Sequence, residues 1–105
     1  MTGKTRKQQI EEMLAEDPND SFLRYGLAME CMNSGDPSAA DGHFRALIEF
    51  NADYIPAYLM YGQLLARESR NEEARQVLSK GIAAASKKGD EHARSEMEAF
   101  LGELA

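Results

Sequence analysis

Apolar residues recur along the chain at helical spacing, in segments separated by polar turn sequences. The interruptions stand at Asp17-Pro18, Gly35-Asp36-Pro37, Asp53, Asn71 and Gly89-Asp90. The final segment shows the spacing clearly, with apolar residues at Ala93, Met97, Phe100, Leu101 and Leu104. Such spacing places them on one face of a helix. The pattern predicts six helices, at about 5–16, 19–33, 37–50, 54–68, 72–87 and 91–104.

The residues at the interruptions suit helix ends. Asp36 before Pro37 is a start signal, because aspartate accepts bonds from free amides and proline fits the first helical position. Asp17 before Pro18 is expected to act in the same way, and Asn71 is expected to cap the fifth helix. Gly35 and Gly89, the remaining turn signals, suit the left-handed conformation that follows a helix.

The segments repeat at an offset of 34 residues. Residue class is kept between Ala40 and Ala74, Phe44 and Leu78, Ile48 and Ile82, Leu27 and Tyr61, and Ala28 and Gly62. A repeat of this length indicates stacked helical pairs. An offset of 36 gives more identities between the second and fourth segments, such as Gly26 with Gly62, and stays open. We prefer 34 because it keeps the turns in phase without gaps.

Residues at these repeated positions resemble the tetratricopeptide repeat (TPR) family over roughly residues 6–85. The first-helix pattern is matched by Tyr58, Tyr61, Gly62 and Leu65, and the second-helix pattern by Ala74, Leu78 and Gly81. Arg24, Cys31 and Leu47 depart from it. The resemblance implies an all-α, right-handed superhelix of about six antiparallel helices. We expect a flexible N-terminus at 1–5, then one domain at 6–105: a half-repeat at 6–18, repeats at 19–52 and 53–88, and a capping helix at 90–104.

The first helices of successive TPR repeats line a concave groove that binds peptides, and this resemblance implies a site here. The 34-residue register places in the groove Phe22, Tyr25, Met29, Met32, Leu59, Met60 and Gln63. Leu23, Leu27, Ala28 and Cys31 then face the core, so the second helix is apolar on two faces. The alternative is that both faces are core, since an inner helix of such a stack touches neighbours on two sides. These positions lack the basic residues with which some members bind a terminal carboxylate, so a ligand would present apolar anchors.

Composition and charge narrow the classes of protein. The chain has 105 residues and a net charge of −6. Nucleic-acid binders carry a basic surface, so this class is disfavoured. Seven β-branched residues are few for a sheet protein. No apolar run approaches the ~20 residues of a membrane span, and no signal peptide is evident. A single cysteine excludes an internal disulfide, and the default expectation is a cytoplasmic protein.

Candidate catalytic and metal-binding residues form no convincing pattern. Cys31 stands where the repeat packs a large apolar residue, so we expect it to be buried and inert. His43 and His92 stand alone and are expected to face solvent, because metal ligands usually come in close pairs. Gly42 and Gly81 lie inside helices, where each costs about 1 kcal/mol against alanine, and close helix packing is the expected reason. We expect no enzyme, cofactor or metal.

The sequence therefore predicts a non-enzymatic protein–protein interaction module that binds a peptide or helix of a partner in an apolar groove. The alternative is a self-associating scaffold that uses the same surface to form a homodimer. Neither a nucleic acid nor a membrane is expected as a partner.

Overall fold

Six helices account for almost all of the described chain. The computed structural model describes residues 3–104 and contains no strand within them. The expected flexible segment at 1–5 therefore lies partly outside the described residues. The helices are α1 (Arg6–Glu16), α2 (Ser21–Asn33), α3 (Pro37–Phe50), α4 (Ile55–Arg67), α5 (Asn71–Lys88) and α6 (Glu91–Glu103). The prediction of an all-α fold is confirmed.

The helix starts follow from side chains that accept free backbone amides. Thr5 and Gln8 form a reciprocal capping box at α1. Asp36 caps α3 and receives the amide of Ala39, as predicted. The expected cap at Asp17 is wrong: Asp17 ends α1, and Asp20 caps α2.

At the start of α5 the expected cap, Asn71, is already the first helical residue. The residue before it, Arg70, makes no side-chain cap bond and instead pairs with Glu73. The expected left-handed glycines are confirmed at Gly35, with φ of 80°, and at Gly89, with φ of 73°.

The positions of the helices confirm the 34-residue register. α2 and α4 each have 13 residues and begin at Ser21 and Ile55, while α3 and α5 begin at Pro37 and Asn71. Both pairs of starts are 34 residues apart. Burial repeats in the same way, since Leu27 and Tyr61 are both buried. The alternative offset of 36 is thereby ruled out for these helices.

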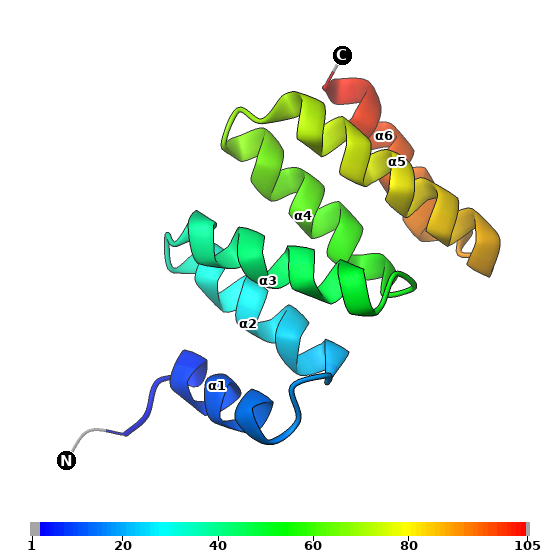
Figure 1. Ribbon diagram of the computed structural model, residues 1–105. Coiled ribbons are helices and arrows are strands. Elements are labelled where there is room, and N and C mark those ends of the chain that lie inside the picture. The colour runs from blue at the N-terminus through cyan, green and yellow to red at the C-terminus, as the bar shows by residue number, and fades with distance from the viewer. Residues whose placement is uncertain (1–2, 105) are drawn as a thin grey trace. The chain divides into compact units, whose positions relative to one another are not determined.

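The chain divides into two compact units, residues 1–51 and 52–105. In the first, α2 packs against both α1 and α3 (Figure 1). Its core draws on all three helices and contains Ile10, Leu14, Leu27, Ala28, Cys31, Ala40, Phe44 and Leu47. Asn51 at the end of α3 donates to Ser21 at the start of α2, with 2.7 Å between the nitrogen and the hydroxyl oxygen. These contacts hold α2 in place from both sides.

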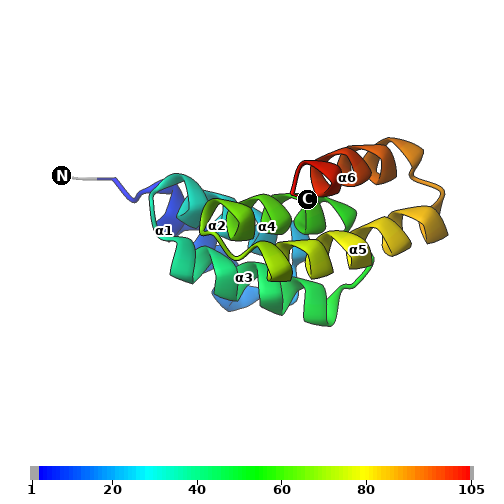
Figure 2. The same cartoon turned by 90° about the horizontal axis from the view of Figure 1, so that it is seen from above.

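In the second unit, α5 lies between two helices at a glycine. Figure 2 shows α5 and α6 running in opposite directions from the turn at Gly89. A Cβ atom at Gly81 would lie 2.4 Å from Tyr58 Cβ of α4 and 2.5 Å from Met97 Sδ of α6. Met97 is fully buried. Gly81 thus allows both neighbours to approach the backbone of α5, as expected from the sequence.

Gly42 does not share this explanation. Nothing lies within 4 Å of the place where its Cβ would be. The expectation that close helix packing accounts for this glycine is therefore wrong, and alanine would fit there freely.

These two glycines give opposite predictions for the same substitution. Gly81→Ala should lower the free energy of unfolding by about 1–3 kcal/mol, because the added methyl overpacks the contact with Tyr58 and Met97. Gly42→Ala should raise it by about 0.5–1 kcal/mol, because alanine favours an exposed helix interior. Urea denaturation followed by circular dichroism measures both. A destabilised Gly42→Ala, or an unchanged Gly81→Ala, would contradict this account of the packing.

The packing of the second unit leads to a prediction about the stability of a chain without α6. A chain that ends at Gly89 uncovers the side of α4 and α5 that Met97 now fills, and it loses the bond from Arg75 to the carbonyl oxygen of Leu104. In repeat proteins, terminal helices cover apolar surface that the array cannot leave open. The truncated chain should therefore melt at a lower temperature. Retention of the full-length melting temperature would show that α6 is dispensable.

Candidate functional site

The seven side chains expected to contact a ligand fall in two groups. The first unit carries, on α2, Phe22, Tyr25, Met29 and Met32, and the second carries, on α4, Leu59, Met60 and Gln63. Phe22 is 72% exposed, whereas Met32 keeps 6% of its surface. The other five are half-buried. Phe22 therefore offers most of its side chain to a ligand, and Met32 offers little.

The two apolar faces of α2 are only partly used by the core. Leu27, Ala28 and Cys31 are buried, as expected of the core face, whereas Leu23, expected on the same face, is half-buried. On the other face, the ring of Tyr25 packs edge-on against Phe44 of α3, with 6.3 Å between ring centroids and 66° between planes. Tyr25 therefore belongs in part to the α2–α3 contact, which the sequence pattern did not indicate.

An apolar pocket of about 200 Å³ lies between α1 and α2, where sequence reasoning placed no site. We call it the α1–α2 pocket; its lining residues are Arg6, Gln9, Ile10, Met13, Phe22, Leu23 and Gly26. Helical spacing puts Met13 on the same side of α1 as Ile10 and Leu14. Met13 is 46% exposed, while Ile10 and Leu14 are each 6% exposed. The signal available was the antiparallel pairing of two helices joined by a short turn, which brings Met13 beside Phe22.

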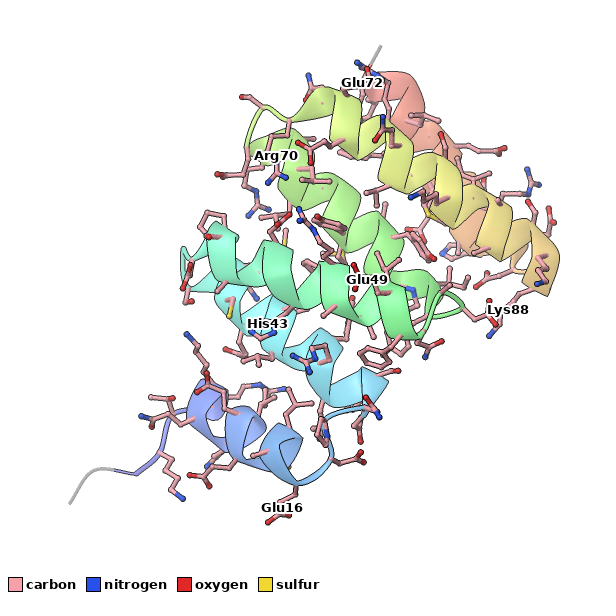
Figure 3. All side chains as sticks on the ribbon, viewed as in Figure 1. Glu16, His43, Glu49, Arg70, Glu72 and Lys88 are labelled. Carbon is pink, nitrogen blue, oxygen red and sulfur yellow. The ribbon has the colours of Figure 1, made fainter. Side chains whose placement is uncertain are left out.

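Contrary to the expectation from the sequence, His43 does not face solvent. It is half-buried on α3 (Figure 3). Its ring contacts Arg24 of α2. Arg24 Nη1 lies 3.3 Å from His43 Nδ1, and Nη2 donates to the carbonyl oxygen of Pro18 at 3.2 Å. A guanidinium can only donate, so Nδ1 accepts and the proton of the neutral imidazole resides on Nε2. The pair therefore links α2 to α3 in a form that requires neutral histidine.

Burial and charge both disfavour protonation of His43. Burial lowers the pKa of its imidazole, and the adjacent Arg24 cation lowers it further. Lys7 acts in the same direction, while the carboxylates of Glu11 and Asp36 oppose it. The net direction is downward from the ordinary value.

The other candidate catalytic and metal-binding residues do not come together in a site. Cys31 is fully buried, and burial raises the pKa of its thiol, which keeps it protonated and a poor nucleophile. His92 is exposed and lies 3.2 Å from Glu96 on its own helix. Within residues 3–104, nowhere do three or more metal-ligating side chains gather. Among these residues, none of the helices combines the length and apolarity that crossing a membrane requires.

The lowered pKa of His43 predicts an acid-dependent loss of stability. Above about pH 6.5, the ordinary value for histidine, both folded and unfolded forms hold neutral His43. As the pH falls from there through the lowered folded pKa, the unfolded chain binds the proton first and stability declines. Melting temperatures between pH 8 and pH 5.5 should show this decline. His43→Gln should flatten the profile, whereas His92→Gln, at an 87% exposed side chain, should leave it unchanged. A profile that keeps its slope in His43→Gln would refute the assignment.

Comparisons with known proteins agree with the repeat geometry. A scan against models of known families finds no match. A TPR repeat-containing protein of Pseudomonas aeruginosa is 30% identical over 95 residues, which cover 90% of each chain. The crystal structure of a TPR domain protein from Salinibacter ruber is 30% identical and covers 81% of this chain and 94% of its own, with a TM-score of 0.76. The solution structure of a Bordetella parapertussis protein is 29% identical and covers 97% and 89%, with a TM-score of 0.83. This chain belongs to the tetratricopeptide repeat family.

Proposed function

We propose that the chain is a protein-interaction module that binds a peptide or helical segment of a partner through apolar side chains of α2 and α4. TPR domains generally serve in protein–protein interaction and are generally not enzymes. The observation that supports the proposal here is apolar surface left over after the core is filled. Phe22 is the most exposed of these side chains, and Tyr25, Met29, Leu59 and Met60 are half-buried.

The chemistry of these side chains favours a ligand with apolar anchors. Methionine is flexible and polarizable, so its side chain adapts to differently shaped partners. Amphipathic helices commonly dock by placing apolar anchors in such surfaces. The proposed contact residues include no lysine or arginine that would recognise a terminal carboxylate. We therefore propose a partner that is recognised by its apolar residues.

Self-association is the second candidate function. The observation that favours it is that three large apolar side chains of the first unit, Met13, Phe22 and Phe50, are each more than 40% exposed. A second copy of the chain would cover such surface through a symmetric interface. Light scattering after size exclusion, over a hundredfold range of concentration, separates the two functions. A constant mass of 11.7 kDa supports the module, and twice that mass, falling on dilution, supports the scaffold.

Selection from a phage-displayed library of random 16-residue peptides tests the proposed module. We expect enriched peptides that carry large apolar residues and bind at least tenfold more weakly to Met29→Glu and to Met60→Glu, because a charge would enter an apolar contact. Gln76→Glu on the exposed side of α5 is the matched control and should bind as the natural chain does. Fluorescence anisotropy with the synthesised peptides measures the affinities.

Two results would overturn the module. One is a selection that enriches no peptide over an empty support. The other is equal loss of binding in Gln76→Glu, which would point to a general charge effect.

A further inference from the structure

The contact between α1 and α2, called the seam here, is closed by an ion pair at one end and open along the rest of its length. At one end Arg6 Nε lies 2.7 Å from Glu30 Oε1, which ties the start of α1 to the end of α2. In the middle, Ile10 faces Gly26 across the α1–α2 pocket. Near the other end Met13 and Phe22 line the same pocket and are 46% and 72% exposed. The pocket therefore has a buried floor and exposed apolar walls.

Gly26 leaves this space open without any need from the chain's own packing. A Cβ at Gly26 would meet only Ile10 Cδ1, at an ordinary 3.7 Å. At Gly62 and Gly81 the corresponding Cβ would lie 2.7 Å and 2.4 Å from its nearest neighbour, so those two glycines are required. Alanine at Gly26 would fit and would make the helix more stable by about 0.5–1 kcal/mol. The chain's own packing therefore does not require glycine at this position, and the pocket beside it stays open.

The size of the pocket suits one large apolar side chain. Its volume is about 200 Å³, and an apolar cavity of about 150 Å³ is large enough to hold a benzene ring. Exposed Phe22 and Met13 would cover the inserted group from two sides. An aromatic or large aliphatic anchor would remove from water both itself and these two walls.

The charges beside the pocket indicate what kind of partner would bind there. Met13 also borders a shallow depression on α1 that contains Glu12 and Glu16. Among the described residues Glu16 makes no ion pair, and it lies at the end of α1 (Figure 3). The nearby cations are already engaged, Lys4 with Glu12 and Arg6 with Glu30. The unbalanced charge beside the apolar walls is negative, which favours a basic partner.

The same charge argues against a second copy of the chain. In a symmetric dimer that formed at this pocket, Glu16 and the acidic residues near it would face the same residues of the second copy. Each copy also carries a net charge of −6. Like charges at an interface cost free energy and suppress that pairing.

We infer that the α1–α2 pocket is a docking site for a basic amphipathic segment of a partner protein, which inserts one large apolar side chain beside Gly26. This inference rests on the proposed function and adds to it a site and a partner chemistry. Lysine or arginine beside the anchor would meet Glu16, while the anchor would lie between Met13 and Phe22.

Two glycines provide a matched test. Gly26→Leu fills the pocket, and Gly42→Leu adds the same side chain to an open position of another helix in the same unit. The 16-residue peptide library is selected in parallel on the natural chain and on both variants. We expect peptides with an aromatic or large aliphatic anchor and several Lys or Arg on the natural chain and on Gly42→Leu, and at least tenfold lower enrichment on Gly26→Leu. Circular dichroism confirms that both variants fold.

The walls and the charge are tested in the same way. Phe22→Gln should weaken binding of the enriched peptides at least tenfold, whereas Phe50→Gln, an exposed phenylalanine outside the pocket, should not. Glu16→Gln should weaken it about threefold at low salt and hardly at all at high salt, since exposed charges are screened. Glu49→Gln on α3 is the matched acidic control (Figure 3).

The outcomes separate this inference from the proposed function. Peptides that enrich equally on Gly26→Leu but lose binding to Met29→Glu and Met60→Glu would overturn the pocket and leave the interaction module standing. Enriched peptides that are acidic would overturn the charge argument. A doubled mass that Phe22→Gln returns to 11.7 kDa would make a second copy the occupant and overturn the inference. No enrichment on any variant would overturn the proposed function as well.

Discussion

The distance between neighbouring helices is the constraint on which the second unit depends, and glycine sets it. At Gly81 the backbone of α5 itself is the surface against which Tyr58 and Met97 pack. The Tyr58 hydroxyl also donates to the carbonyl oxygen of Ala52, at 2.6 Å. At Gly62 the same device lets Leu78 of α5 pack onto the backbone of α4. The three helices thus interlock through contacts that leave no room for a methyl group.

The first unit uses glycine differently. Beside Gly26 there is room for a methyl group at ordinary contact distance from Ile10, and α1 and α2 are held by the burial of Ile10 and Leu14 and by the Arg6–Glu30 pair. An exposed ion pair contributes little free energy. The seam is therefore the less tightly packed of the two kinds of helix contact. A surface of this kind accepts a foreign side chain at small structural cost, whereas the Gly81 contact has no space to offer.

The sequence predicted the features that depend on local chemistry and periodicity. The six helices, the 34-residue register, the cap at Asp36 and the close approach at Gly81 all follow from spacing, turn residues and the resemblance. The wrong predictions have two causes. Either two residues could cap the same helix, or the sequence did not show how far a neighbouring helix extends. Asp17 and Asp20 are equally good caps by type, and only the path of the turn decides that Asp20 starts α2.

The other wrong predictions, and the site that was missed, depend on how far each helix extends over its neighbour. Periodicity shows which face of a helix is apolar, but it does not show how far the neighbouring helix extends over that face. Met13 therefore shares a face with Ile10 and Leu14 and is still half exposed, while His43 was expected to face solvent and lies against Arg24. The α1–α2 pocket escaped notice for the same reason, since it exists only because Gly26 fails to fill a space that its neighbours enclose.

Energetics connect the open seam to the proposed binding. Gly26 forgoes about 0.5–1 kcal/mol of helix stability relative to alanine. A ligand that binds only the folded seam returns about 2.7 kcal/mol when its concentration is a hundred times its dissociation constant. Binding near saturation therefore exceeds what the glycine forgoes. Because α1 buries just Ile10 and Leu14, much of the returned free energy would go into holding α1 against α2. A basic segment bound in the pocket would then fill the space beside Gly26. It would tighten the contact between α1 and α2, as the close approaches at Gly62 and Gly81 tighten the contacts of the second unit.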